Sequence, residues 1–332
     1  MHEPLCLLAV HAHPDDEASK GAATVARYHR EGVRTVLVCC TGGEAGDILN
    51  PAMDTPEVRR SLPEVRLAEL HKSAEIIGYD EVVMLGFRDS GMPGSKTSQD
   101  PRCFARAPLE EAVGRLVKVV RRVRPQVVIT YPEDQQAYPH PDHLRVHEIT
   151  VAAFDAAGDP AAFRDAGEPW QPLKLYYTIW SRRRMLAAHE KFLELGLTSP
   201  FDDHWFDRPS LDHMVTTAVD VTGLGHVQLD ALRAHATQID PASPFWFGLP
   251  PEVAGELHPY DEYILARDLC EDPRSAAARA HEGKVPRGGV RPDGEPAGGE
   301  PFAAGGTSSR SSGARSELEP DLFSRVTKGA CT

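Results

Sequence analysis

Short, unbroken apolar runs alternate with helix-patterned segments through the first half of the sequence, and this alternation constrains the fold most. The runs expected to form strands are Leu5–Val10, Arg34–Cys40, Glu81–Leu85 and Gln126–Tyr131. The segments expected to form helices are 18–30, 61–77, 109–123 and 143–157. Strands that are apolar on both faces are typical of parallel sheets covered by helices on both sides. The sequence therefore predicts an α/β fold: a Rossmann-like, open, mostly parallel sheet with helices on both faces.

The rest of the chain predicts a smaller region and a tail. Strands are expected at Lys174–Trp180 and Met214–Val221, and helices at Ser181–Leu195 and Leu229–Ile239. We expect residues 1–160 to form the core and residues 161–270 to cap the substrate pocket within the same domain. Residues 271–332 contain runs such as GEPAGGEP and GGTSSRSSG. Such a composition buries too little apolar surface to offset chain entropy, so we expect this tail to be disordered.

Composition excludes several classes of partner. The formal net charge of -13 repels nucleic acid and anionic membranes. The six cysteines form no C-x-x-C pair, which excludes a zinc ribbon and a disulfide framework. Neither a signal-peptide pattern nor a long apolar stretch is present, so the sequence predicts a cytoplasmic protein that acts on a small molecule. A homo-oligomer remains compatible with these observations.

The loop after the first expected strand reads HAHPDDE. It lacks the glycine patterns that bind dinucleotides or phosphates, so other chemistry must occupy this end of the sheet. His13 and Asp16 are spaced so that one imidazole and one carboxylate can bind the same ion. Asp15 then points elsewhere and can serve as the general base that takes a proton from water. The alternative is that these side chains only cap a strand and the following helix.

A second cluster, AYPHPDH, follows the fourth expected strand and should lie on the same edge of the sheet. Catalytic zinc needs three protein ligands and an open position. His143 is the third ligand we expect, because it can occupy the first turn of the following helix. His140 then stays in the loop, where it can face a substrate oxygen. Two histidines and one carboxylate also suit Fe(II), so iron is a second candidate for the metal.

These motifs carry a resemblance to a known family. HPDDE after the first strand and HPDH after a later strand resemble the PIG-L/LmbE-like zinc deacetylases, which remove acyl groups from N-acylated amino sugars. Further segments resemble the branch of that superfamily that hydrolyses mycothiol S-conjugates. They include TGGEAGDILNPAMD, EVRLAEL, LGFRDSGMPG, CFARAPLE and RAHATQID. Together the similar segments cover most of residues 1–270.

The resemblance implies the same three zinc ligands and the same base as the motif chemistry. It further implies that His140 polarises the substrate or acts as an acid, and that Tyr138 donates to the oxyanion. Six residues are implied to bind substrate: Lys20, Glu44, Arg66, Asp89, His235 and Gln238. A surface salt bridge, a solvated lysine or a structural polar pair would explain several of them equally well.

The function implied is a zinc-dependent amidase that hydrolyses the amide between the cysteinyl and glucosaminyl parts of a mycothiol S-conjugate. Its products would be glucosaminyl inositol and an N-acetylcysteine S-conjugate. The sequence does not separate a role in detoxification from the trimming of a mycothiol-bearing biosynthetic intermediate. A deacetylase of N-acetylglucosaminyl inositol is a close alternative. A catalytically idle metal-binding scaffold is an alternative of another class.

Overall fold

The computed structural model describes residues 4–135, 139–270 and 318–326. Its centre is a seven-stranded sheet in the order β3-β2-β1-β4-β5-β7-β6. The strands are β1 Cys6–His11, β2 Arg34–Thr41, β3 Glu81–Phe87, β4 Val127–Thr130, β5 Lys174–Thr178, β6 Thr217–Asp220 and β7 Tyr260–Asp268. The first five strands pair in parallel, and β7 runs antiparallel to both of its neighbours.

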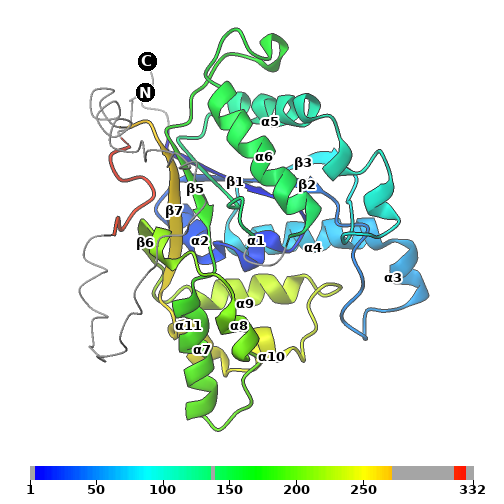
Figure 1. The fold of residues 1–332 in the computed structure, drawn as a ribbon, viewed down its shortest axis with the longest axis vertical. Helices are drawn as coiled ribbons and strands as arrows, with labels where there is room; N and C mark the ends of the chain where they lie inside the picture. Colours follow the sequence, from blue (N-terminus) through cyan, green and yellow to red (C-terminus); the bar gives the residue numbers. More distant parts are fainter. Residues whose placement is uncertain (1–3, 136–138, 271–317, 327–332) are drawn as a thin grey trace, which may run out of the picture.

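Helices cover both faces of the sheet, as Figure 1 shows. They are α1 Asp16–Ser19, α2 Ala22–Arg30, α3 Pro56–Arg60, α4 Leu62–Ile77, α5 Leu109–Val123, α6 Pro141–Ala156, α7 Arg182–Glu194, α8 Asp203–Asp207, α9 Gly225–Ala234, α10 Pro244–Phe247 and α11 Pro251–Glu256. Short 3₁₀ turns lie at Thr97–Gln99, Phe104–Arg106, Arg164–Ala166 and Asp212–Met214.

The apolar core has two halves, one on each face of the sheet. Alternate side chains of β1 point to opposite faces, because successive residues of a strand do so. Leu8 and Val10 pack with α5 and α6, whereas Leu7 and Ala9 pack with α2, α4 and α9. All four side chains are fully buried. This two-sided burial explains why the strands read as unbroken apolar runs.

Helices α7, α8, α10 and α11 form an outer group beyond α9 (Figure 1). They have a small apolar cluster of their own, centred on Phe192, Phe201 and Leu249. Several aromatic side chains pack against this cluster, including Trp205 and Phe245. The outer group is therefore held together by an aromatic-rich apolar cluster that is separate from the core on the two faces of the sheet.

The predicted fold class is confirmed, and the differences are local. Strand β7 was not predicted, and with β5 and β6 it extends the sheet beyond residue 160. The helix expected over 18–30 is split by Gly21, whose φ is +82°. A Cβ at Gly21 would lie 2.8 Å from the hydroxyl of Tyr263, so a side chain is excluded there. The helix expected to reach Ile239 ends at Ala234.

Residues 318–326 pack against the sheet, which corrects the expectation of disorder for this part of the tail. Leu322 and Phe323 join the core on the α2 side, and the Tyr28 hydroxyl donates to Asp321 at 2.7 Å. Glu319 bridges to β6 and accepts from the buried ammonium of Lys174 at 3.1 Å. The remaining tail residues, 271–317 and 327–332, lie outside the described residues. Within the described residues, no helix combines the length and apolarity that crossing a bilayer requires.

Candidate active site

The two histidine-rich loops meet at the carboxyl edge of the sheet because β1 and β4 are parallel neighbours. His13 lies in the loop after β1, Asp16 begins α1, and His143 lies in the first turn of α6. One donor atom from each of the three lies within 4.8 Å of the others. The Asp16 carboxylate is 3.6 Å from Nδ1 of His13 and 3.3 Å from Nε2 of His143. The structure thus brings together the three residues that the sequence selected.

The charges around this trio suit a cation. Burial would raise the pKa of Asp16, but the Lys20 ammonium, 2.7 Å away, and His143 hold it well below its usual range. Burial lowers the pKa of His143. Burial would also lower the pKa of His13, but the carboxylates that face its ring raise it well above its ordinary value, so this place favours a positive charge, which a metal ion can supply in place of the proton. An anionic carboxylate and a neutral imidazole are the forms that bind metals. The donor set therefore fits a divalent metal ion that accepts nitrogen and oxygen ligands.

Asp15 lines the same cavity as the trio but is not one of the grouped donors. Its backbone has a φ of +117°, a strained conformation for a residue other than glycine. Two contacts hold it there: its N–H donates to Glu17 at 3.0 Å, and Arg66 Nη2 lies 3.1 Å from its carboxylate. Burial raises the pKa of Asp15, and Arg66 opposes this rise. A carboxyl group whose pKa is raised is suited to take up a proton and give it back during catalysis.

His140 is the N-cap of α6, where its Nδ1 accepts a hydrogen bond from the N–H of Asp142 at 3.2 Å. Burial, and next the neighbouring His13, lower the pKa of His140 to about 4. The ring is therefore neutral at pH 7. Because its Nδ1 accepts, the proton sits on Nε2. His140 is thus a hydrogen-bond donor at the wall of the cavity, placed beside the ring of His13 at 4.6 Å between centroids.

Asp142 is a site residue that the sequence reasoning missed. Its carboxylate lies 3.2 Å from Nε2 of His13 and accepts from the backbone N–H of Ser90 at 2.9 Å. The Ser90 hydroxyl also donates to it. A carboxylate behind a ligating histidine fixes the ring and its tautomer. The sequence did contain a signal for this residue, because Asp142 is the acidic residue within the HPDH motif.

A second group of potential donors combines His13 with Asp89 and His140. Unlike the trio, this group contains an imidazole without a free lone pair, because Nδ1 of His140 accepts from the N–H of Asp142 and its Nε2 carries the proton. Asp89 in turn accepts backbone N–H groups from Gly91 and Ala45 at 2.8 and 3.0 Å. The trio with Asp16 is therefore the better metal site.

Four of the six residues implied to bind substrate line the cavity beside the trio: Lys20, Arg66, Asp89 and Gln238. The other two require correction. Glu44 does not line it; its carboxylate accepts from the N–H of Asp89 at 3.0 Å and so holds that loop. His235 is fully buried behind the site. Tyr138 lies outside the described residues.

His235 pairs with Glu17, which is also fully buried. Nε2 of His235 lies 2.5 Å from the Glu17 carboxylate, and the Ser73 hydroxyl donates to the same oxygen at 2.5 Å. Because the other Glu17 oxygen accepts from the N–H of Asp15, this cluster supports the loop that carries the candidate base. The sequence reasoning took His235 for a substrate contact only because the segment RAHATQID resembles the family.

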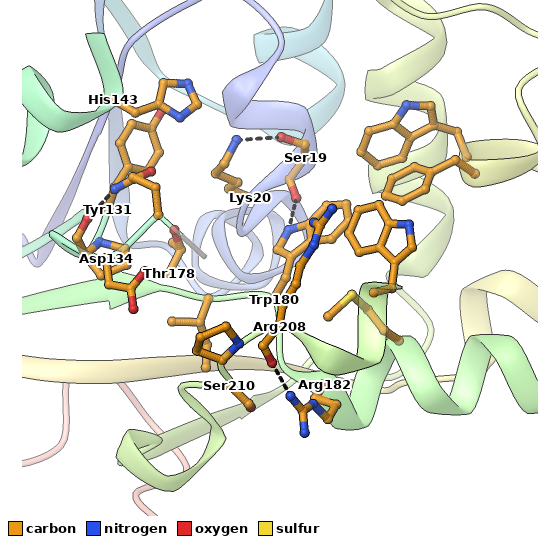
Figure 2. A pocket seen from close by; sticks show the side chains of 18 residues that line it. Ser19, Lys20, Tyr131, Asp134, His143, Thr178, Trp180, Arg182, Arg208 and Ser210 are labelled. Carbon is orange, nitrogen blue, oxygen red and sulfur yellow. Dashed lines mark hydrogen bonds between the residues drawn. The ribbon is translucent and has the colours of Figure 1, made fainter. Parts of the chain in front are cut away.

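Two cavities meet at His143, one member of the trio. The polar cavity has a volume of about 390 Å³ and includes Asp15, Asp47, Arg66, Asp89, His140 and Gln238. The aromatic cavity has a volume of about 470 Å³ and includes Thr178, Trp180, Arg182, Trp205, Arg208 and Phe245. Both are lined by Ser19, Lys20, His143 and Trp246. Figure 2 shows His143 and Lys20 at the inner end of the aromatic cavity. An extended molecule can therefore occupy both cavities with its centre at the trio.

Similar proteins identify the family. A family model described as PIG-L, GlcNAc-PI de-N-acetylase, matches residues 8–154. The mycothiol S-conjugate amidase of Streptomyces coelicolor is 43% identical over 280 residues, which are 82% of this chain and 94% of that protein. The chain belongs to the PIG-L family. The predicted family and the predicted enzyme class, a hydrolase of amide bonds, are confirmed.

Two further comparisons bear on this PIG-L member. It is 41% identical over 273 residues to the 1D-myo-inositol 2-acetamido-2-deoxy-alpha-D-glucopyranoside deacetylase of Geodermatophilus obscurus, covering 79% of this chain and 92% of that protein. Its fold resembles the N,N'-diacetylchitobiose deacetylase of Pyrococcus horikoshii with a TM-score of 0.54 at 16% identity. The match covers 79% of this chain and 84% of that chain. The structural likeness supports the fold alone.

Proposed function

We propose that this protein is a zinc-dependent amidase of mycothiol S-conjugates. It hydrolyses the amide between the cysteinyl and glucosaminyl parts and releases glucosaminyl inositol and an N-acetylcysteine S-conjugate. The observation that carries this proposal is the pair of cavities that meet at His143, one member of the trio. A substrate with a large group on each side of its scissile amide would fill both cavities. The 43% identity with an amidase of that name supports it.

Zinc is the proposed metal, with His13, Asp16 and His143 as its ligands. When bound, zinc lowers the pKa of water and polarises a carbonyl group. The same donor set suits Fe(II). Metal analysis of protein purified without air and without added zinc distinguishes the two.

In the proposed mechanism, Asp15 takes a proton from the water that attacks the amide carbonyl carbon. His140 donates a hydrogen bond from Nε2 to the oxygen on which negative charge develops, and such donors contribute about 3 kcal/mol each. The carbon–nitrogen bond then breaks, and the proton held by Asp15 passes to the departing amine. Arg66 keeps the Asp15 carboxylate oriented throughout. A contribution from Tyr138 stays a prediction.

On the polar side, the substrate is a polyhydroxylated amino sugar. Asp89 and Asp47 offer carboxylate acceptors for hydroxyl groups. Gln238 offers its carbonyl oxygen, because its amide nitrogen already donates to the Asp47 carbonyl and to Thr237. Lys20 lies between the two cavities, and its ammonium is engaged by Asp16. Lys20 is placed to meet the cysteinyl part, next to the scissile bond.

A second candidate function is the deacetylation of N-acetylglucosaminyl inositol, which the 41% identical deacetylase supports. This reaction needs the polar cavity and space for one methyl group. It leaves the aromatic cavity of about 470 Å³ without a role. The amidase is therefore favoured, whereas an idle scaffold is not.

The two functions are separated by measuring kcat/KM of the zinc-loaded protein on a mycothiol S-conjugate and on N-acetylglucosaminyl inositol. We expect the conjugate to be hydrolysed with the higher kcat/KM. A higher value for the acetylated sugar would overturn the amidase proposal and favour the deacetylase. The products identify the bond that is broken, since only the amidase releases an N-acetylcysteine S-conjugate.

A further inference from the structure

The aromatic cavity is built from segments that are distant in the sequence. Trp180 follows β5, Arg182 and Met185 belong to α7, Trp205 belongs to α8, and Phe245 belongs to α10. The indole N–H of Trp180 donates to the carbonyl of Ser19 at 3.2 Å and so joins this wall to the last residue of α1. The cavity is thus part of the fixed framework around the trio.

Its wall is a cluster of aromatic rings. The rings of Trp180 and Phe245 are stacked, with 10° between their planes and 5.5 Å between their centroids. Trp246 stands edge-on to Phe245 at 4.8 Å, and Trp205 lies 5.6 Å from Phe245. All four side chains remain partly exposed. Aromatic rings that keep a free surface inside a cavity are typical of binding sites for flat apolar groups.

Two arginines, Arg182 and Arg208, also line the cavity. The Arg208 guanidinium lies 4.1 Å above the ring of Trp205, and Arg182 donates to the carbonyl of Arg208. Within the described part of the chain, neither guanidinium has a carboxylate at ion-pair distance. The two arginines that follow Arg182 on α7 do have carboxylate partners. Arg183 pairs with Glu262, and Arg184 pairs with Asp261.

Figure 2 shows how these groups are arranged along the cavity. His143 and Tyr131 lie at the inner end, Trp180 in the middle, and Arg182 at the opposite end. The acidic Asp134 lies near Tyr131, at the inner end. A group that enters from the trio therefore passes Lys20, whose ammonium is paired with Asp16, and then the aromatic wall before it reaches Arg182.

We propose that the aromatic cavity binds the S-substituent of the conjugate and selects flat aromatic substituents that carry an acidic group at their far end. This inference rests on the proposed amidase function. The polyhydroxylated sugar fits the polar cavity, so the carbonyl side of the amide, with its cysteinyl sulfur and substituent, points into the aromatic one. The aromatic rings stack on the substituent, and Arg208, with Arg182, binds its carboxylate.

The test compares three substrates that differ only at sulfur: the S-methyl, S-(2-naphthylmethyl) and S-(6-carboxy-2-naphthylmethyl) conjugates of mycothiol. With the zinc-loaded protein, we expect kcat/KM to rise by about tenfold from methyl to naphthylmethyl, because stacking and burial of a ring stabilise the bound state. The carboxylate should add about another fivefold at low ionic strength, through charge-assisted hydrogen bonds.

Two variants test whether these gains in kcat/KM arise from contacts in the aromatic cavity. Phe245→Leu should reduce the gain from the naphthyl group, and Arg208→Gln should remove the gain from the carboxylate. Arg183→Gln is the matched control, because Arg183 lies on α7 but does not line the cavity. It should leave both ratios as in the wild type. Thermal unfolding of each variant confirms that it is folded, and ratios between substrates cancel any loss of active protein.

Direct binding gives a second readout. The products N-acetyl-S-(2-naphthylmethyl)cysteine and N-acetyl-S-methylcysteine are titrated into the zinc-loaded protein while tryptophan fluorescence is recorded. We expect tighter binding of the naphthyl product and quenching that is weaker in Trp205→Phe.

The outcomes separate the inference from the function on which it rests. If the three conjugates are hydrolysed with equal kcat/KM, or if Arg208→Gln and Arg183→Gln behave alike, the inference is overturned and the amidase stands. If no conjugate is hydrolysed although the protein deacetylates N-acetylglucosaminyl inositol, the proposed function itself is overturned.

Discussion

Nε2 of His13 lies 3.2 Å from Oδ2 of Asp142, and both side chains are largely or fully buried. This contact joins the loop after β1 to the first turn of α6. It leaves Nδ1 of His13 facing Asp16 at 3.6 Å. Asp142 therefore determines which nitrogen of His13 is available to a metal.

Replacing Asp142 with Asn should weaken metal binding by about 10–100-fold, the usual effect of losing a carboxylate behind a ligating histidine. Glu148→Gln is the control, because Glu148 lies on the same helix in an exposed pair with Arg145. Competition with a chromophoric chelator measures both affinities. Equal affinities in the two variants would contradict the role of Asp142.

Replacing Arg66 with Lys should lower kcat more than it changes KM. Arg66 donates to the carbonyls of Gly43 and Pro14 and lies 3.1 Å from the Asp15 carboxylate, so one planar group fixes three partners. Lysine lacks that geometry. We expect kcat to fall by about 10–100-fold through misplacement of the base.

Steady-state kinetics of Arg66→Lys and of Arg59→Lys test this prediction. Arg59 is exposed and pairs with Asp54. The control variant should match the wild type. A change confined to KM in Arg66→Lys would show that Arg66 binds substrate without orienting Asp15.

The buried pair of His235 and Glu17 predicts a pH-dependent stability. Burial alone would lower the pKa of His235, but the facing carboxylate of Glu17 outweighs it and raises the pKa above its ordinary value. The unfolded chain releases this proton near pH 6.5, whereas the folded protein keeps it. The stabilisation is therefore complete below about pH 6.5 and is lost as the pH rises through the raised pKa.

Urea unfolding of the wild type and of His235→Gln from pH 6 to pH 9 measures this effect. The difference in unfolding free energy should be largest at pH 6 and shrink toward pH 9. His29→Gln, at an exposed histidine near Asp80, provides the control. A difference that grows with pH would contradict the assigned charge of the pair.

The C-terminal residues 318–326 should stabilise the fold although their composition suggested disorder. Leu322→Ala should lower the unfolding free energy by about 2–5 kcal/mol, because Leu322 is fully buried. Glu319→Gln should also destabilise, since it leaves the buried Lys174 ammonium without its ion-pair partner. Ser324→Ala is the control. Chemical denaturation of the three variants gives the values; equal stability would show that this segment does not dock in solution.

The sequence predicted those parts of the fold and site that depend on local patterns. Helix α5 matches its prediction residue for residue, because its apolar positions follow the helical period. His13, Asp16 and His143 were found because each stands in a short motif directly after a strand. Parallel neighbours then bring the two motifs together.

What the sequence did not show depends on contacts between distant segments. Strand β7 pairs with β5 and β6, and its direction follows from the whole topology. The aromatic cavity draws Trp180, Trp205 and Phe245 from separate segments, so no local spacing marks it. His235 was assigned to substrate binding from the resemblance of RAHATQID alone, and its burial opposite Glu17 cannot be read from spacing.

The central claim is that the His13, Asp16 and His143 trio holds the ion that serves amide hydrolysis, with Asp15 as the base. The most direct test measures metal content and turnover of a mycothiol S-conjugate in the same samples of wild type, Asp15→Asn and His143→Ala. We predict about one zinc ion per chain in the wild type and in Asp15→Asn, with kcat of Asp15→Asn lower by about 10²–10⁴-fold. His143→Ala should lose both metal and turnover. Near wild-type turnover in Asp15→Asn, or full metal content and activity in His143→Ala, would contradict the account.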